Sequence, residues 1–240
     1  MKRNNWPETL LAWFDGSRRA LPWREDHPRN PYHVWVSEIM LQQTRTETVK
    51  GYFQRWMEQF PTIRDLAQAP EEQVLRAWQG LGYYSRARNL HKAARQVMAE
   101  WGGQLPRERK ALGSLAGIGA YTVGAILSMA FGEKIPAVDG NLLRVLSRLY
   151  GVEEDISGTQ GKKTITALAE EAIPGARPGD FNEALMDLGA EVCIPRHPRC
   201  EACPLTAFCQ AWKEGKTEIL PVKKPKAPQK ELAAACGLVV

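Results

Sequence analysis

The sequence lacks the features that mark membrane proteins and exported proteins. Nowhere do about eighteen apolar residues follow one another, as they do in a helix that crosses a lipid bilayer. The opening segment, MKRNNWPETLLAWFDGSRRALPW, has too short an apolar stretch and too many charges for a signal peptide. We therefore expect a cytoplasmic protein that does not engage a membrane.

The composition is that of an ordinary soluble protein with a slight excess of positive charge. The chain has 240 residues, of which 44% are hydrophobic and 25% are charged. This length can bury one large core or two modest ones. The 32 Lys and Arg residues exceed the 27 Asp and Glu residues, for a net charge of +5. Such a balance is compatible with nucleic acid but does not require it.

The alternating pattern of a β-strand is absent before about residue 230, and no internal repeat or low-complexity tract is present. Helical periodicity runs nearly throughout, so the sequence predicts an all-α fold. Asn30 and Pro31 supply a cap and a first-turn proline for YHVWVSEIMLQQTRTETV, which is expected to form one helix or a bent pair. Gly80 and the pair Gly102–Gly103 are expected to end later helices.

The composition changes after the last helical segment. PVKKPKAPQK is rich in lysine and proline, which is typical of a linker. The final residues, ELAAACGLVV, resemble the first strand of a further domain that the chain does not continue. The alternative is a short tail that packs on the helical body.

Cysteine is scarce outside one short segment. Four of the five cysteines, Cys193, Cys200, Cys203 and Cys209, stand in CIPRHPRCEACPLTAFC with the spacing C-x6-C-x2-C-x5-C, and Cys236 stands alone. In the reducing cytoplasm, clustered thiols bind metal more often than they form disulfides. Thiolates suit either a structural zinc ion or an iron–sulfur cluster, and the spacing by itself leaves both open.

The segment LAGIGAYTVGAI has the pattern of two helices joined by a glycine hairpin. Gly117 and Gly119 tolerate positive φ angles and let backbone N–H groups approach a phosphate closely. A helix starting near Ala120 directs the positive end of its dipole at the same anion. A plain glycine turn between packed helices is the alternative, and we favour phosphate binding.

Glu38 is a candidate general acid. At helical spacing its neighbours are Val34, Trp35 and Leu41, with Gln42 on the next turn. A carboxyl group on an apolar face is desolvated, which raises its pKa and favours the protonated form near neutral pH. The alternative is an exposed or ion-paired glutamate at a helix edge.

Asp139, in PAVDGNLLRVL, is a candidate catalytic anion. Its position at a helix start makes it a favoured N-cap, and most such residues only cap. The helix dipole at the same position is expected to keep the carboxylate ionised. An anion held there can stabilise an oxocarbenium-like transition state.

Together these segments resemble the endonuclease III superfamily of base-excision DNA glycosylases, and most closely its members that remove adenine. The resemblance runs from about Leu21 to Cys209. It rests on the hairpin, the four-cysteine array and the following segments: LPW, VWVSEIMLQQT, GLGYYSRARNLHKAA, PAVDGNLLRVLSRL and FNEALMDLGAEVC.

The resemblance implies two helical domains with the active site between them. Residues 25–133 would form a six-helix barrel that carries the helix-hairpin-helix motif. Residues 1–24 and 134–213 would form the domain of the iron–sulfur cluster loop. A linker, 214–230, would lead to 231–240, the start of a truncated C-terminal domain that recognises 8-oxoguanine in full-length members. The preference for 8-oxoguanine over guanine would then be weakened.

The implied activity is hydrolytic removal of adenine mispaired with 8-oxoguanine or guanine in double-stranded DNA, by a monomer with one [4Fe–4S] cluster. Base flipping brings the adenine into a pocket. Glu38 would protonate adenine N7, Asp139 would stabilise the sugar cation, and Asn141 would support this site. Tyr121 stands where bifunctional relatives carry a lysine nucleophile, so base removal without robust strand cleavage is expected.

Further residues are assigned by the same resemblance. The adenine pocket would contain Arg19, Trp23, Arg24 and Glu183, with Arg18 an equal candidate to Arg19. The DNA-contacting residues would be Leu41, Gln42, Gln43, Thr44, Tyr83, Arg86, Gly117, Gly119, Arg196 and Arg199. Tyr83 would be a wedge beside 8-oxoguanine, Gln43 would fill the space of the flipped base, and Arg86 would hold phosphate. Tyr84 is expected in the core.

Two other functions remain open at this point. One is an endonuclease III-like glycosylase and lyase for oxidised pyrimidines, against which Tyr121 argues. The other is a non-catalytic iron–sulfur protein that binds DNA or transfers electrons, against which the combination of Glu38 and Asp139 argues.

Overall fold

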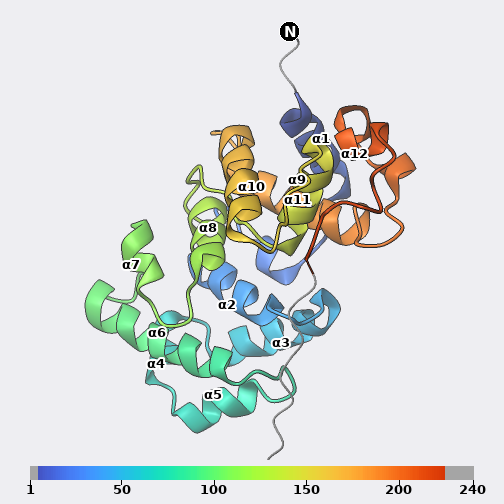
Figure 1. The fold of residues 1–240 in the computed structure, drawn as a ribbon. Helices are drawn as coiled ribbons and strands as arrows, with labels where there is room; N and C mark the ends of the chain where they lie inside the picture. The colour runs from blue at the N-terminus through green and yellow to red at the C-terminus, as the bar shows by residue number, and fades with distance from the viewer. Residues whose placement is uncertain (1–4, 225–240) are drawn as a thin grey trace, which may run out of the picture.

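The computed structural model describes residues 5–224, which form helices joined by turns and contain no strand (Figure 1). The all-α prediction is confirmed. The stretch 231–240, expected to begin a further domain, lies outside the described residues, as does Cys236. No helix within the described residues is long and apolar enough to cross a membrane. The α-helices are α1 (Trp6–Ser17), α2 (Pro31–Leu41), α3 (Thr46–Gln59), α4 (Ile63–Gln68), α5 (Glu71–Ala77), α6 (Ser85–Trp101), α7 (Arg109–Gly113), α8 (Ala120–Met129), α9 (Gly140–Tyr150), α10 (Thr159–Ala172), α11 (Pro178–Glu191) and α12 (Gln210–Lys213), with short 3-10 turns η1 (Pro22–Arg24), η2 (Cys200–Ala202) and η3 (Thr206–Phe208).

Helix α2 begins where the sequence predicts. The Asn30 side chain accepts a hydrogen bond of 2.9 Å from the backbone N–H of Tyr32, and Pro31 occupies the first turn. The helix ends at Leu41, and α3 starts only at Thr46. The long apolar segment is therefore a pair of helices separated by a short turn, and that turn borders the site described below.

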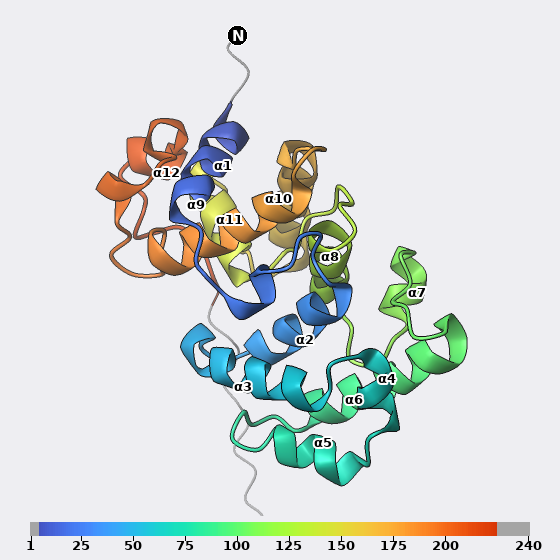
Figure 2. The same cartoon turned by 180° about the vertical axis from the view of Figure 1, so that it is seen from behind.

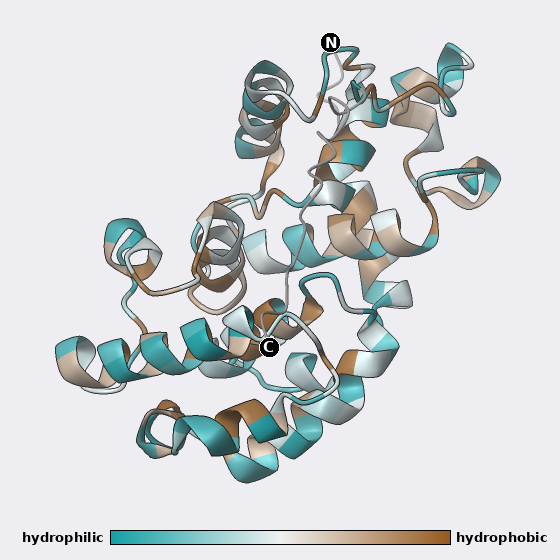
Figure 3. Cartoon of the chain, turned by 60° about the horizontal axis from the view of Figure 1, so that its bottom comes forward, coloured by the Kyte–Doolittle hydropathy of each residue, from teal (hydrophilic) through white to brown (hydrophobic). Residues whose placement is uncertain are grey.

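The hydrophobic residues gather in two clusters. One contains buried residues between Leu21 and Leu127, and the other contains residues 6–14 together with residues 142–205. Most helices carry both hydrophobic and hydrophilic residues, as expected for helices that each bury one face (Figure 3). The N-terminal helix α1 thus packs with the C-terminal part of the chain, against α11.

Helices α2 and α8 lie between the two ends of the molecule. Helices α3–α6 form one end, and α1 with α9–α12 forms the other (Figures 1 and 2). The buried Asn182 of α11 ties these parts together: its Oδ1 accepts a hydrogen bond from Ala137 N, and its Nδ2 donates to Ser128 Oγ at 2.8 Å and to Ile135 O at 3.0 Å. A fully satisfied buried amide fixes α11 against α8 in one arrangement.

The first part of the expected linker 214–230 is docked on the helical body. Leu220 is buried, and its carbonyl oxygen accepts a hydrogen bond of 2.8 Å from Arg148 Nε. The backbone N–H of Ile156 donates to the carbonyl of Val222 at 3.1 Å. The lysine- and proline-rich composition therefore placed the start of the linker too early in the chain. One buried leucine and backbone hydrogen bonds are enough to hold this first part of the segment on the helical body.

Candidate active site and DNA-facing surface

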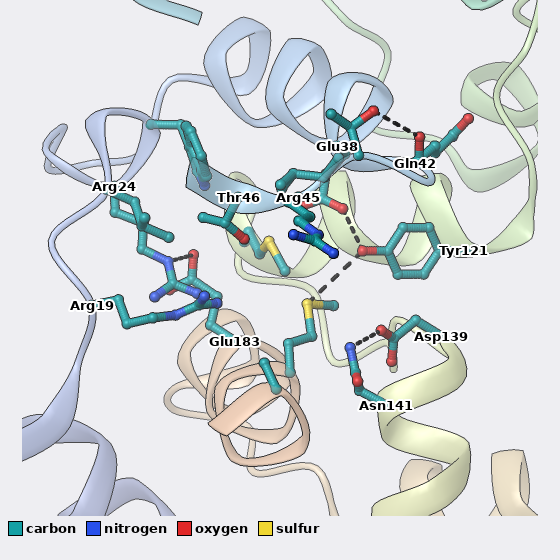
Figure 4. A pocket seen from close by; sticks show the side chains of 17 residues that line it. Arg19, Arg24, Glu38, Gln42, Arg45, Thr46, Tyr121, Asp139, Asn141 and Glu183 are labelled. Atoms are coloured by element: carbon teal, nitrogen blue, oxygen red, sulfur yellow. Dashed lines mark hydrogen bonds and ion pairs between the residues drawn. The ribbon is translucent and has the colours of Figure 1, made fainter. Parts of the chain in front are cut away.

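A cavity of about 370 Å³ lies between the two hydrophobic clusters, a size typical of small-ligand sites (Figure 4). It brings together residues from η1, α2, α8, α9 and α11. Glu38 and Asp139, about a hundred residues apart in the chain, face this same space. The predicted residues that line it are Arg19, Trp23, Arg24, Glu38, Leu41, Gln42, Thr44, Tyr121, Asp139, Asn141 and Glu183. The cavity is also lined by Leu21, Arg45, Thr46, Met129, Met186 and Ala190, none of which was predicted.

Glu38 is buried on α2, with 5% of its surface exposed. Its carboxylate accepts a hydrogen bond from the Tyr121 hydroxyl. Burial raises the pKa of Glu38 to about 7, and the hydrogen bond from Tyr121 opposes this rise. A large fraction of this carboxyl is therefore protonated at neutral pH, as a general acid requires.

Tyr121 lies in the first turn of α8 and borders the cavity (Figure 4). Its hydroxyl lies 3.9 Å from the sulfur of Met186 on α11. Burial, reinforced by the nearby carboxylates of Glu38 and Asp139, raises the pKa of Tyr121 well above its usual value. The phenol thus remains a hydrogen-bond donor, and it orients the Glu38 carboxyl toward the cavity. The sequence predicted that Tyr121 lines the pocket but not that it contacts Glu38.

Asp139 is both the N-cap of α9 and a cavity residue. Its Oδ1 accepts a hydrogen bond of 2.7 Å from Leu142 N, and its Oδ2 accepts one of 2.8 Å from Asn141 Nδ2. The helix start was expected to keep the Asp139 carboxylate ionised. Burial raises the pKa of this carboxyl from its ordinary value, because it outweighs the hydrogen bonds that favour the charged form.

A chain of hydrogen bonds continues from this site toward the cysteine-rich loop. Asn141 Oδ1 accepts a bond of 2.8 Å from Arg144 Nη2, and Arg144 Nε donates at 2.7 Å to the carbonyl of Cys193. Arg144 Nη2 also donates to the carbonyl of Gly189 at 2.7 Å. A Cβ at Gly189 would lie 2.6 Å from the Cβ of Asn141, so α9 and α11 approach this closely only with glycine there. No pattern in the sequence indicated the role of Arg144.

The wall of the cavity opposite α9 is a buried ion network. Arg24 binds both carboxylate oxygens of Asp187, at 2.7 and 3.1 Å, and its Nε lies 3.2 Å from Glu183 Oε1. Arg19 also pairs with Asp187. Burial lowers the pKa of Arg24, but Glu183 and Asp187 outweigh it and leave the pKa raised. Asp187 was not predicted, although its position one helical turn after Glu183 was a usable signal.

Two more arginines converge on Glu183. Arg29 Nη2 donates to Glu183 Oε2 at 2.8 Å, and Arg18 Nη2 lies 3.6 Å from the same oxygen. Arg29 comes from the loop before α2 and was not predicted. Arg18 and Arg19 therefore both reach this network, Arg18 through Glu183 and Arg19 through Asp187. Only Arg19 of the two lines the cavity.

The glycine hairpin lies between α7 and α8 and is exposed at both glycines. Gly117 has a φ of 76°, and a Cβ there would lie 2.7 Å from the Cβ of Asn89, so glycine is required. Gly119 has a φ of −92° and so does not use the positive φ that glycine tolerates. No side chain caps α8, which leaves the N–H groups of its first turn open to an anion.

Two exposed turns border the α2 end of the site. Gln43 and Tyr83 have φ angles of 59° and 47°, conformations that non-glycine residues rarely adopt. Tyr83 is 63% exposed, as a side chain that inserts into DNA must be. Tyr84 is 39% exposed, so its expected place in the core is wrong.

Arg86 is buried beneath these two turns, although it was predicted to hold phosphate. Its guanidinium donates to five backbone carbonyl oxygens and approaches the Thr44 hydroxyl at 3.4 Å. The phosphate role is therefore wrong for this side chain, because its η nitrogens are occupied by the protein itself. The accepting carbonyls belong to Ile39, Met40, Gln42, Leu81 and Gly82.

The four clustered cysteines line one largely apolar cavity next to α9. No three His, Cys, Asp or Glu side chains within residues 5–224 lie close enough to hold a single metal ion. A tetrahedral zinc site brings its thiolates to about 3.8 Å from one another, whereas a cluster spreads them around several irons. Four thiols on one cavity are a donor set that suits an iron–sulfur cluster as well as zinc. The lining thiols are Cys193, Cys200, Cys203 and Cys209.

The buried Arg148 braces the loop between the first two of these cysteines. It donates to the Cys193 sulfur at 3.4 Å, to Ile194 O at 2.7 Å and to Pro195 O at 3.0 Å. Arg196 and Arg199, predicted to contact DNA, are both exposed on this loop. The loop therefore presents two cations from a braced backbone.

Comparison with known proteins agrees with this architecture. Residues 36–174 match the HhH-GPD superfamily of base excision DNA repair proteins. The chain is 47% identical to the adenine DNA glycosylase of Homo sapiens over 88% of its own length, but it covers only 40% of that protein.

Two solved structures share the fold. A thermostable thymine-DNA glycosylase superposes with a TM-score of 0.78 at 32% identity, covering 87% of this chain and 95% of that one. A trapped endonuclease III–DNA covalent intermediate superposes with a TM-score of 0.72 at 24% identity, covering 87% and 94%. The chain belongs to the HhH-GPD superfamily of base excision DNA repair proteins.

Proposed function

We propose that this protein is a monofunctional DNA glycosylase that removes adenine mispaired with 8-oxoguanine or guanine. The observation that carries the proposal is the placement of Glu38 and Asp139 on one cavity, with a pKa of about 7 for Glu38. The human relative of the chain is named an adenine DNA glycosylase. The chain spans less than half of that protein, so we propose the same activity for this chain on the evidence of its own site.

The reaction divides between the two carboxyl groups. The protonated Glu38 donates its proton to N7 of the flipped adenine, which makes the base a better leaving group. Asp139, in its ionised form, stabilises the positive charge that develops on the sugar as the glycosidic bond breaks. Water then adds to the sugar carbon and loses a proton, leaving free adenine and an abasic site.

The ion network opposite Asp139 suits recognition of the base. Glu183 and Arg24 line the cavity and are held in place by Asp187 and Arg29. A carboxylate and a guanidinium fixed side by side offer an acceptor and donors to the edge of a purine. We assign adenine recognition to this wall.

The chemistry of the cavity also favours hydrolysis over strand cleavage. No lysine is among the residues that line it, and Tyr121 occupies the first turn of α8. A phenol cannot form the Schiff base through which a lysine amine cleaves the sugar–phosphate backbone. Double-stranded DNA, bound by a monomer, is the proposed partner.

The decisive assay uses duplexes with adenine opposite 8-oxoguanine, guanine or thymine, and a duplex with thymine glycol. We expect the adenine strand of both mispairs to break only after hot alkali, and A:T and thymine glycol to remain intact. Breakage without alkali would instead indicate a bifunctional lyase. No product under any condition would indicate a DNA-binding protein without catalysis.

We also propose that the four cysteines hold one [4Fe–4S] cluster whose role is structural. Bound at these thiols, the cluster would pin the loop of Arg196 and Arg199, so less ordering entropy is lost when the loop meets phosphate. We expect protein purified without oxygen to be brown and to contain about four iron atoms per chain. Cys203→Ser should lower the iron content, while Cys236→Ser should not. A colourless protein with one zinc ion would contradict this assignment.

A further inference from the structure

The two exposed turns with strained backbones share one buried anchor. Turn 42–44 follows α2 and contains Gln43, and turn 81–83 precedes α6 and contains Tyr83. Among the described residues, only one other non-glycine residue, His197, has a positive φ. Non-glycine residues rarely adopt a left-handed conformation, so surrounding contacts must hold both turns in place.

Arg86 supplies these contacts and divides them between its two terminal nitrogens. Its Nη1 donates to Ile39 O and Met40 O at 3.0 Å each, and also to Gln42 O. The carbonyls of Ile39 and Met40 belong to the last turn of α2, where the helix leaves them without partners and favours a cation. Nη1 therefore holds the first turn.

The second nitrogen reaches the other turn and bridges back to the first. Nη2 donates to Leu81 O at 2.9 Å and to Gly82 O at 3.2 Å, and it lies 3.4 Å from the hydroxyl of Thr44. One planar guanidinium thus binds two segments that are about forty residues apart. A lysine ammonium, with three donors on a single atom, cannot make this set of bonds.

The anchor itself is fixed to the core. The guanidinium lies over the ring of the fully buried Trp78, 5.3 Å from its centroid, and the Trp78 indole N–H donates to Gly82 O at 3.1 Å. It also lies 5.6 Å from the ring of Tyr83. Movement of either turn would break several of these contacts at once.

We propose that Arg86 is a positioning residue that locks the Gln43 turn and the Tyr83 turn into one rigid unit, so that the two side chains enter the DNA together. This inference rests on the proposed glycosylase function. Gln43 would occupy the space of the flipped base while Tyr83 wedges the stack beside the partner base. Arg86 touches neither the DNA nor the reacting atoms and acts only through these turns.

The test is a cycle of substitutions read by the single-turnover rate of adenine removal from a duplex with A opposite 8-oxoguanine. In the otherwise native chain we expect Gln43→Ala and Tyr83→Ala to be non-additive, with a coupling of about fivefold in rate. In an Arg86→Lys background we expect a rate about tenfold lower and no coupling. A residue needed only for folding would change the amount of folded enzyme but not this coupling.

Two comparisons complete the experiment. Arg76→Met, at an arginine whose side chain is 75% exposed and paired with Glu72, should keep the native rate and melting temperature. If Arg86→Lys does not fold, the cycle in the native background decides alone. Independent effects of Gln43→Ala and Tyr83→Ala there, or coupling that survives in folded Arg86→Lys, would overturn the inference. A native chain that removes no adenine would instead overturn the proposed function.

Discussion

Replacing Glu38 with glutamine should lower the rate of adenine removal by about 10²- to 10⁴-fold while leaving the fold and DNA binding intact. Glutamine keeps the shape of the side chain and an oxygen that can accept the Tyr121 hydrogen bond, but it has no acidic proton to give. Single-turnover rates, with binding to an abasic-site duplex as the control, separate these effects. A variant that retains native activity would remove Glu38 from the mechanism.

The pH dependence of the native enzyme gives a second check on Glu38. Since the protonated form is active and its pKa is about 7, the rate should fall as pH rises through about 7. In Tyr121→Phe the hydrogen bond that lowers this pKa is lost, so the alkaline fall should move to higher pH. A profile that does not respond to Tyr121→Phe would contradict the contact between these two side chains.

The same raised pKa predicts an effect on stability. The folded state holds the Glu38 proton more tightly than the unfolded state does, with a pKa of about 7 against 4.5. The contribution of Glu38 to stability is therefore fully present below the unfolded pKa and is lost as pH rises through about 7. At pH 8, Glu38→Gln should raise the free energy of unfolding by up to about 3 kcal/mol, and at pH 4 the gain should vanish. Urea denaturation at both pH values measures it.

Replacing Asp139 with asparagine should lower the rate of adenine removal by about 10²- to 10³-fold, because the charge that stabilises the sugar cation is lost. Asparagine is as good an N-cap as aspartate, so the hydrogen bond to Leu142 N can remain. The raised pKa of Asp139 indicates that burial disfavours its charge, so the neutral variant should be at least as stable at pH 7.

Asp139→Ala provides the matched comparison for this prediction. It removes both the charge and the cap, and should lower the free energy of unfolding by about 1 kcal/mol in addition to the loss of rate. Equal stability of the two variants would show that capping by Asp139 is unimportant. Near-native activity of Asp139→Asn, measured by single-turnover kinetics, would exclude Asp139 as the catalytic anion.

Local sequence signals predicted much of the framework. The cap and proline at Asn30 and Pro31 marked the start of α2, and the glycine pattern marked the hairpin before α8. The apolar neighbours of Glu38 indicated a buried carboxyl with a raised pKa, which the structure has. The division of the chain into domains at residues 25 and 134, the choice of mispair and the DNA contacts stay predictions.

The sequence by itself determined an all-helical chain, a buried acid on one helix, an aspartate at the start of another and a thiol array with a fixed spacing. Only the tertiary structure decided which of these residues lie close together, and whether burial or hydrogen bonding has the larger effect on each pKa. Arg86 and Ile39 are 47 residues apart and Arg24 and Asp187 are 163 apart, so no local pattern could assign their contacts. The rise in the Asp139 pKa has the same origin: desolvation depends on everything packed around a group, whereas a capping pattern covers only a few adjoining residues.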